Sequence, residues 1–189
     1  MNVMEQFRLD GQVAVVTGGG KGIGRGIAVA LAQAGADVAV ASRSAADLAE
    51  VVAAIEAEGR RGLAVPTDVT VMEQLENLAA RTVAELGAPT IWVNNAGGLP
   101  DATPRYLTRT PEDRFDAQIA LNLKPVWSGS VTAAAHMPES GGVIINISSR
   151  GARGPQRKNG PYGASKAATN SLTETLSVEL APRIRVNAV

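Results

Sequence analysis

Short apolar runs alternate with longer amphipathic segments along this sequence, and that alternation restricts its fold more than any other feature. Most runs are continuously apolar, which is typical of strands buried on both faces. Strands joined by helical segments form right-handed crossovers and a parallel sheet. The sequence therefore predicts an α/β protein with a doubly wound parallel sheet and helices on both faces, in three layers. The predicted strands are Val13–Thr17, Val38–Ala41, Gly62–Pro66, Ile91–Asn94, Val143–Ser148 and Ile184–Val189.

Length and composition narrow the class of protein. We expect a single domain over residues 1–189, large enough to bury roughly 70% of its unfolded surface. The chain has no cysteine and one histidine, which excludes disulfides and zinc–thiolate sites, predicts no metal centre and argues against a Ser–His–Asp triad. Its 18 basic residues balance 18 acidic residues and 3% of residues are aromatic, so we expect no nucleic-acid partner.

Neither a secretion signal nor a membrane span is visible in the sequence. The first ten residues include Glu5, Arg8 and Asp10 and no apolar run. The most apolar window, Gly26–Ala41, is interrupted before it reaches the ~20 apolar residues of a transmembrane helix. We therefore expect a cytoplasmic protein with no membrane partner.

A glycine-rich turn follows the first predicted strand and precedes a helical segment. Thr17–Gly24 has the spacing T-G-x-x-x-G-x-G rather than the strict G-x-G-x-x-G. Glycines let the backbone approach a pyrophosphate, whose charge the N-terminus of the helix then favours. Between a strand and a helix, this turn favours a nucleotide site over a merely flexible turn. The candidate cofactor-binding residues are Gly18, Gly20, Lys21, Gly22, Ile23 and Gly24.

The residue type at the end of the second strand indicates whether a site prefers NAD or NADP. An acidic residue there accepts hydrogen bonds from the adenosine ribose, whereas a basic residue pairs with a 2′-phosphate. This strand ends in Ser42 and Arg43, and Lys21 adds a second positive charge from the glycine turn. Asp37 begins the strand instead of ending it. We therefore predict a preference for NADP(H), with NAD(H) and ordinary surface roles for both cations as alternatives.

A tyrosine and a lysine lie one helical turn apart after the fifth strand. Tyr162 and Lys166 share one face of a predicted helix, and Ser149 leaves the end of the strand thirteen residues before Tyr162. A phenol alone keeps its proton to pH ~10 and is a poor base at neutral pH. A neighbouring cation favours the phenolate and prepares the group for proton exchange. The Tyr–Lys spacing is common by chance, and it is the serine at the same sheet edge that favours a catalytic group.

Taken together, these motifs resemble those of the short-chain dehydrogenase/reductase family, which has a Rossmann-type fold. The resemblance covers essentially the whole chain, in order and with family-like spacing. It implies an oxidoreductase that moves a hydride between a nicotinamide and a ketone or secondary alcohol. The motifs that carry it are Thr17–Gly24, Asp68-Val69, Asn94-Asn95-Ala96-Gly97, Asn122, Ser149, Tyr162-x-x-x-Lys166 and Arg185-Val186-Asn187-Ala188.

The resemblance also implies a role for each site residue. Tyr162 would exchange a proton with the substrate oxygen, Lys166 would favour the phenolate and hold the nicotinamide ribose, and Ser149 would orient the substrate oxygen. Asn122 would support a water relay to the lysine. The chemistry of proline separately predicts that Pro125 kinks the same helix beside Asn122, with a merely tolerated proline as the alternative. The other implied cofactor contacts are Asp68 and Val69 beside the adenine, and Asn95, Ala96 and Gly97 along the cleft. Ser148 is then a neighbour without a catalytic role. His136 falls late in the Asn122 helix, away from the strand ends, and we expect it to be structural or solvated.

Substrate and assembly are less restricted by the sequence. Basic residues in the two loops expected at the cleft favour a 3-oxoacyl thioester, whose phosphates or acidic carrier protein they would attract. Solvated loop charges, a general sugar, steroid or xenobiotic alcohol dehydrogenase, and a non-catalytic nucleotide-sensing relative are the alternatives. The family analogy implies a homodimer or homotetramer. The basic residues are Arg105, Arg109, Arg150, Arg153, Arg157 and Lys158.

Members of this family usually continue past Val-Asn-Ala-Val into a further strand and a substrate lid. A sheet that ended at its sixth strand would expose an apolar edge. We therefore expect the sequence to be a piece of a longer protein, with a shortened protein that lacks its lid and part of the nicotinamide site as the alternative.

Overall fold

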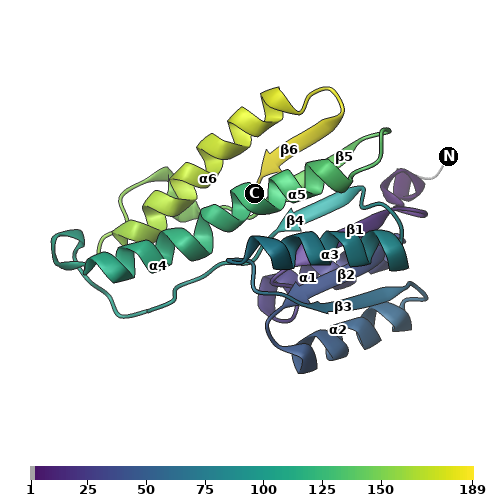
Figure 1. Cartoon of the computed structure of the whole chain (residues 1–189), viewed down its shortest axis with the longest axis horizontal. Coiled ribbons are helices and arrows are strands. Elements are labelled where there is room, and N and C mark those ends of the chain that lie inside the picture. Colours follow the sequence, from purple (N-terminus) through teal and green to yellow (C-terminus); the bar gives the residue numbers. More distant parts are fainter. Residues whose placement is uncertain (1–2) are drawn as a thin grey trace.

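A computed structural model describes residues 3–189 and contains one six-stranded parallel sheet in the order β3-β2-β1-β4-β5-β6 (Figure 1). This order confirms the predicted doubly wound α/β fold. Three predicted strands match the structure in both bounds, and the others differ by one or two residues. The strands are β1 (Val13–Thr17), β2 (Asp37–Ser42), β3 (Gly62–Pro66), β4 (Ile91–Asn94), β5 (Gly142–Asn146) and β6 (Ile184–Ala188).

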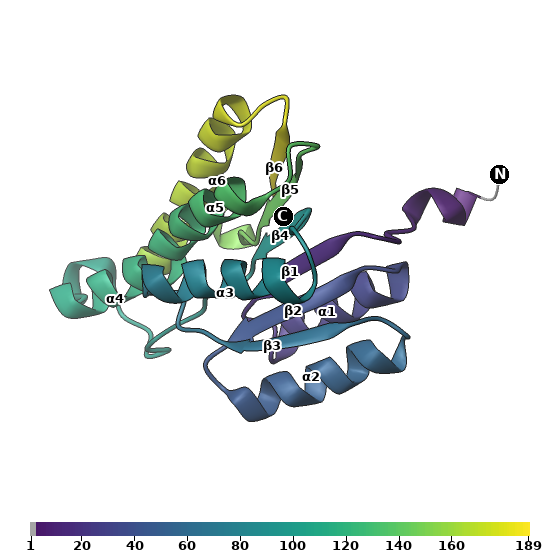
Figure 2. The same ribbon diagram turned by 45° about the vertical axis from the view of Figure 1, so that its right-hand side comes forward.

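Helices cover both faces of the sheet, as Figure 2 shows from a second side. One apolar core packs α1 and α2 on the sheet, and a second packs α3, α5 and α6 on the opposite face. The helices are α1 (Gly22–Ala34), α2 (Ala45–Ala57), α3 (Met72–Glu85), α4 (Glu112–Asn122), α5 (Lys124–His136) and α6 (Gly160–Glu179). Short 3-10 turns are η1 (Val3–Phe7), η2 (Leu107–Arg109) and η3 (Arg150–Arg153).

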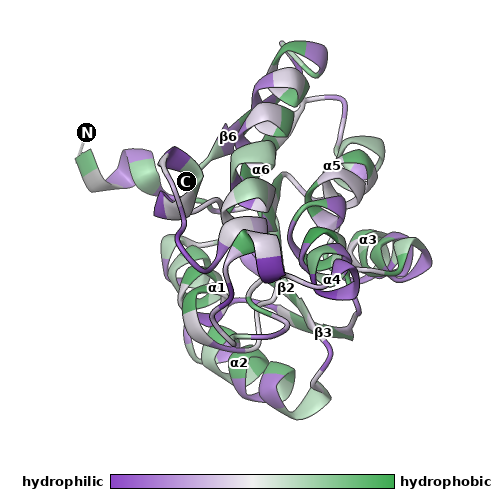
Figure 3. Ribbon diagram, turned by 90° about the vertical axis from the view of Figure 1, so that its left-hand side faces the viewer, coloured by the Kyte–Doolittle hydropathy of each residue, from purple (hydrophilic) through white to green (hydrophobic). Residues whose placement is uncertain are grey.

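The helices are amphipathic, and Figure 3 shows hydrophobic and hydrophilic residues alternating around α1, α2 and α3. Burial follows this pattern, because Leu48, Val51 and Ile55 of α2 are fully buried against the sheet. Full burial of such side chains contributes about 1.5–3 kcal/mol each. No helix within residues 3–189 is long and apolar enough to cross a membrane.

The Asn122 helix is interrupted, as Pro125 predicts. Helix α4 ends at Asn122 and α5 begins at Lys124, with Leu123 between them at φ −112° and ψ −56°. Proline has no N–H and crowds the preceding turn, so the regular hydrogen-bond ladder cannot continue through it. The break therefore lies beside Asn122.

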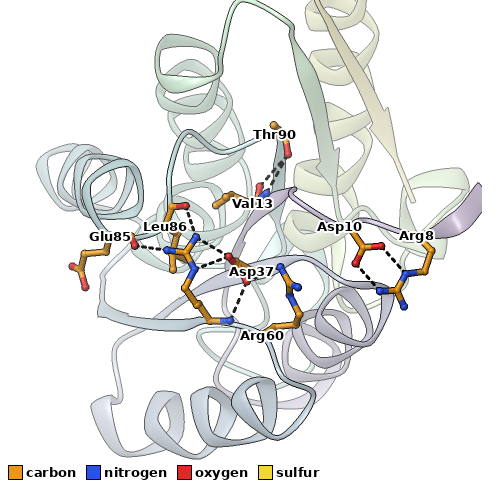
Figure 4. A network of polar contacts seen from close by, with 9 residues as sticks. Arg8, Asp10, Val13, Asp37, Arg60, Glu85, Leu86 and Thr90 are labelled. Atoms are coloured by element: carbon orange, nitrogen blue, oxygen red, sulfur yellow. Dashed lines mark hydrogen bonds and ion pairs between the residues drawn. The ribbon is translucent and has the colours of Figure 1, made fainter.

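Asp37 belongs to an ionic cluster at the amino-terminal edge of the sheet (Figure 4). The register pairs Asp37 with Val13, so both lie at the starts of their strands. Asp37 accepts from the Arg61 backbone N at 3.0 Å and guanidinium at 2.7 Å, and pairs with Arg60 at 3.0 Å. Asp37 therefore has a structural role at the edge opposite the glycine turn.

Candidate active site

The glycine turn between β1 and α1 disfavours side chains, at some positions because of the backbone conformation and at others because of close packing. Gly18 has φ +66° and Gly22 has φ +54°, a region that L side chains rarely adopt. A Cβ atom on Gly24 would lie 2.2 Å from the Gly18 carbonyl oxygen. The turn thus brings bare backbone to the N-terminus of α1, the arrangement that a phosphate requires.

Asn95 holds this turn against the end of β4. Its side-chain Nδ2 donates to the carbonyl oxygens of Thr17 at 2.9 Å and Gly18 at 3.2 Å. The Thr17 hydroxyl accepts from the backbone N atoms of Asn95 and Ala96, each at 3.1 Å. The side chain of Asn95 therefore shapes the cleft by fixing the glycine turn, a contact that its place in the motif did not reveal.

A cleft of about 480 Å³ lies beyond the carboxyl ends of β1, β2, β3 and β4. Its lining brings together seven of the predicted cofactor residues: Gly18, Ser42, Arg43, Asp68, Val69, Ala96 and Gly97. The Ser42 hydroxyl oxygen is buried and has no hydrogen-bond partner within residues 3–189. A buried polar atom without a partner is costly, so this atom fits a ligand that supplies one. The bare backbone, the open cleft and the unpaired hydroxyl together fit a nicotinamide dinucleotide.

Two carboxylates lie beside the cations predicted to bind a 2′-phosphate. Lys21 forms an ion pair of 3.0 Å with Asp47. Hydrogen bonds from the hydroxyl and backbone N of Thr70 lower the pKa of Asp68, and the charge of Arg43 acts in the same direction. Lys21 is therefore partly neutralised, whereas Arg43 is exposed at the cleft without an ion pair in the described region.

Tyr162 and Lys166 lie on one face of α6, as their spacing predicts. The Lys166 Nζ atom is 5.9 Å from the centre of the Tyr162 ring. Lys166 is buried, which lowers its pKa, and Nζ donates to the Ile147 carbonyl oxygen at 2.6 Å. The ammonium is thus held between the Tyr162 ring and the backbone that follows β5.

Neighbouring serines at the end of β5 have different surroundings. Ser148 donates to Asn170 at 2.6 Å, which engages its hydroxyl with α6. The Ser149 hydroxyl accepts from the Gly151 backbone N at 3.0 Å and caps η3. No other hydrogen bond of that hydroxyl is present in the described residues, so its own proton stays available for a substrate oxygen.

Asn122 fixes the loop that follows β4. It is fully buried, accepts from the Gly98 backbone N at 2.8 Å and donates to the Gly98 carbonyl at 2.9 Å. Its Nδ2 also donates to the Gln118 carbonyl oxygen at 3.1 Å. A Cβ atom on Gly97 would lie 2.7 Å from Asn122 Oδ1 and 3.6 Å from Lys166 Nζ. Asn122 and Lys166 therefore both border Gly97.

A buried amide network beneath the site was not assigned from the sequence. Asn94 donates to Asn146 at 2.8 Å and to Ser130 at 3.1 Å, and it accepts from the Trp92 indole at 2.9 Å. Asn146 donates to Thr173 of α6 at 3.0 Å. The network joins β4, β5, α5 and α6 directly behind the site residues. The sequence signal that could have indicated this network is the presence of an asparagine at the end of each of two otherwise apolar strands.

His136 lies outside the site. Its Nδ1 is 3.0 Å from the Thr132 carbonyl oxygen, and its Nε2 is 3.8 Å from Glu76 of α3. The first contact lies within α5 and the second joins α5 to α3, at the C-terminal end of α5. They fit the structural role expected of this residue.

Comparison with known proteins assigns this fold and site to a class. Residues 12–189 match the family model described as short chain dehydrogenase. An uncharacterized oxidoreductase of Mycobacterium tuberculosis is 42% identical over 189 residues, which cover 99% of this chain and 71% of that protein. A short chain dehydrogenase/reductase of Aspergillus oryzae is 40% identical, over 98% of this chain and 72% of its own length.

Solved structures agree with this assignment. Carveol dehydrogenase from Mycobacterium avium, in complex with NAD, superimposes with a TM-score of 0.92 at 33% identity, over 96% of this chain and 70% of that one. A 7α-hydroxysteroid dehydrogenase complexed with NADH and 7-oxo glycochenodeoxycholic acid superimposes with a TM-score of 0.92 at 35% identity. The match covers 100% of this chain and 73% of that one. The protein is an oxidoreductase that acts on alcohols or ketones with a nicotinamide cofactor. It belongs to the short chain dehydrogenase family.

Proposed function

We propose that this protein is an NADP(H)-dependent oxidoreductase in which Tyr162, Lys166, Ser149 and Asn122 serve the reaction. The observation that carries the proposal is the placement of the buried Lys166 ammonium between the Tyr162 ring and the Ile147 carbonyl, at the strand end that also presents Ser149. A sensor protein that only bound a nucleotide would need the glycine turn but not this arrangement.

The bound cofactor supplies or accepts a hydride at the substrate carbon. In reduction, Tyr162 gives its phenolic proton to the carbonyl oxygen, and in oxidation it takes the proton of the alcohol. Lys166 stabilises the phenolate that remains, because a positive charge is held close to the ring. Ser149 donates a hydrogen bond to the substrate oxygen and fixes the direction of proton transfer.

Asn122 serves this site as a positioning residue. Its two hydrogen bonds to Gly98 hold the loop beside Gly97, which also borders Lys166. Pro125 has no N–H to donate to the Leu121 carbonyl, and a water molecule bound there would link Lys166 to solvent. Protons could then be restored to Tyr162 after each turnover.

The preference for NADP(H) rests on Arg43 and Ser42. Arg43 can pair with a 2′-phosphate, and the buried Ser42 hydroxyl needs a hydrogen-bond partner. The neighbours that were solved with NAD or NADH keep NAD(H) as the alternative. Replacing Arg43 by alanine should raise the KM for NADPH about 10- to 100-fold and leave the KM for NADH nearly unchanged. An equal effect on both cofactors would contradict this preference.

A 3-oxoacyl thioester is the substrate class favoured by the basic loops at the cleft. Thioesters of coenzyme A or of an acyl carrier protein bring phosphates or acidic surfaces to such a rim. A general alcohol dehydrogenase is the second candidate, and the steroid substrate of one structural neighbour supports it. Turnover of a charged thioester should depend on salt and turnover of a neutral ketone should not, because attraction between charged groups weakens as ionic strength rises.

Assembly and location complete the proposal: a homodimer or homotetramer in the cytoplasm. Phe115 of α4 and Trp127 and Val131 of α5 are exposed apolar side chains on the described surface. Such side chains gather at subunit interfaces. Light scattering of the purified protein should give two or four times the mass of one chain, and a monomer would contradict the assembly.

A panel of ketones and 3-oxoacyl thioesters tests the function as a whole. Each compound is mixed with protein and with NADPH or NADH, and the loss of reduced cofactor is followed by its near-ultraviolet absorbance. We expect turnover with NADPH and a thioester kcat/KM that falls as salt rises. Binding of cofactor without turnover of any compound would favour a nucleotide-sensing role, and a thioester rate independent of salt would remove that substrate class.

A further inference from the structure

The tips of the two loops that border the cleft are joined to each other. The backbone N of Arg105, in the loop between β4 and α4, donates to the Lys158 carbonyl oxygen at 3.0 Å. The Arg157 guanidinium donates to the Tyr106 hydroxyl at 2.9 Å. The loop tips therefore form one continuous surface just before α6, the helix that carries Tyr162.

Tyr106 holds two cations on this surface. The Arg157 guanidinium carbon is 5.6 Å from the centre of the Tyr106 ring, and the Lys158 Nζ is 5.5 Å from it. Lys158 has φ +65°, a left-handed conformation that is uncommon for a residue with a side chain. An uncommon backbone conformation that persists at the border of an active site is a reason to look for a function there.

Charge in these loops is strongly one-sided. Residues 97–110 and 150–161 contain six basic residues and one acidic residue, Asp101, although the whole chain has equal numbers of each. Asp101 already pairs with Arg114 of α4. Within residues 3–189, none of the six basic side chains in these loops forms an ion pair. Cations without an ion-pair partner attract anions, and this attraction is strongest where two of them contact one ring, as Arg157 and Lys158 do at Tyr106.

Position connects this surface with the reaction. Lys158 precedes Tyr162 by four residues, and α6 begins between them at Gly160. Lys158 and Arg105 border a small hollow that shares Pro100 and Ala117 with the lining of the cleft. A substrate that reaches from the cleft past Pro100 would bring its distal end to Lys158 and to the neighbouring Arg157.

We propose that Arg157 and Lys158, presented by Tyr106, bind an anionic group of the substrate, a carboxylate or a phosphate distant from the reacting carbonyl. This inference rests on the proposed function, since it concerns the mouth of the same site. It assigns the specificity to these two side chains and not to the basic rim in general.

Paired probes that differ only in the anion test the assignment. Levulinate and methyl levulinate share one ketone, as do dihydroxyacetone phosphate and dihydroxyacetone. Their dissociation constants are measured by calorimetry on the Tyr162→Phe protein saturated with reduced cofactor, so that no turnover is needed. We expect the anion of at least one pair to bind roughly 10-fold more tightly than its neutral partner. Preference in the first pair identifies a carboxylate site, and preference in the second identifies a phosphate site.

Variants locate the preference. Adding R157Q and K158Q together should abolish it, whereas R8Q with R81Q removes two positive charges outside the cleft loops and should leave it intact. Tyr106→Phe keeps the ring but loses the Arg157 hydrogen bond, and it should reduce the preference only in part. Absence of preference in both pairs, or a preference that survives R157Q/K158Q, overturns the inference. Failure of the wild-type protein to turn over any carbonyl compound would instead contradict the proposed function, whatever the anions do.

Discussion

The Nζ atom of Lys166 donates a 2.6 Å hydrogen bond to the backbone carbonyl of Ile147, two residues before Ser149. This contact ties α6 to the end of β5, so that the lysine and the serine keep a fixed relation to each other. It also gives the buried ammonium one partner inside the protein, which offsets part of the cost of its burial.

Stability should depend on pH through Lys166. Burial lowers the pKa of its ammonium below the ordinary value of 10.5. Between the lowered value and 10.5 the unfolded chain binds more protons than the folded one, so this group makes stability rise as pH increases across that window. The free energy of unfolding of the wild-type protein should therefore increase relative to that of the Lys166→Met variant as the pH approaches 10.5. A pH-independent difference between the two proteins would show that the ammonium is not desolvated.

The two serines at the end of β5 should separate catalysis from stability. Ser149→Ala removes the hydroxyl assigned to the substrate oxygen and should lower kcat roughly 100-fold or more. Ser148→Ala removes the bond to Asn170 and should cost about 1 kcal/mol of stability with little change in kcat. Steady-state kinetics and denaturant unfolding of both variants check this. A larger kcat loss in Ser148→Ala would exchange the roles of the two residues.

Two glycines of α1 offer a matched pair of substitutions. Gly24→Ala places a methyl group 2.2 Å from the Gly18 carbonyl oxygen, so the turn must shift, and cofactor affinity should fall at least 10-fold. Gly26→Ala meets nothing within 4 Å and should stabilise the helix by about 0.5–1 kcal/mol. Fluorescence titration of reduced cofactor and thermal unfolding measure the two effects. Equal cofactor affinity in the two variants would contradict the packing of the turn.

Acid should weaken the cluster around Asp37 shown in Figure 4. Burial alone would raise the pKa of Asp37, but the hydrogen bonds from Arg61 and the charges of Arg60 and Arg61 outweigh it and hold the pKa below 3.8. The stability that the carboxylate contributes is present above pH 3.8 and is lost as the pH falls through the lowered value.

Asp37→Asn should therefore be less stable than the wild type near neutral pH. The loss should be about 1–3 kcal/mol, below that for a fully buried pair because Arg61 is well exposed to solvent. The two stabilities should converge in strong acid, where the wild-type carboxyl is also neutral. Denaturant unfolding of both proteins across pH checks this, and a constant difference would exclude the ionic contribution.

The sequence was sufficient to predict the strands, their parallel arrangement and the break at Pro125, because apolar runs and proline act locally. Helix starts were less predictable. Ser44 caps α2 by accepting from the Asp47 backbone N at 3.3 Å, which the Ser-x-x-Asp pattern indicates. The similar spacing Thr70-x-x-Glu73 forms no such cap, since α3 begins at Met72 and the Thr70 hydroxyl donates to Asp68 instead. The nearby carboxylate of Asp68 engages the Thr70 hydroxyl, which therefore does not cap the helix.

Contacts between distant segments could not be predicted from the sequence, for a physical reason. The pairing of Lys21 with Asp47 and the engagement of Asn95 with the glycine turn depend on where β1, α2 and β4 end in space. The sheet order that places them side by side follows from the fold as a whole. Residue type and spacing therefore suggest members for the candidate site, but not which of them contact each other.

The Tyr162→Phe variant shows whether this phenol supplies the proton. It keeps the ring beside Lys166 and removes only the proton that the substrate oxygen would receive. With saturating NADPH and the best ketone from the panel, single-turnover oxidation of the cofactor should fall at least 100-fold. The dissociation constant of NADPH should change less than twofold, since the cleft that binds it is intact. Single-turnover rates equal to those of the wild type would show that another group supplies the proton.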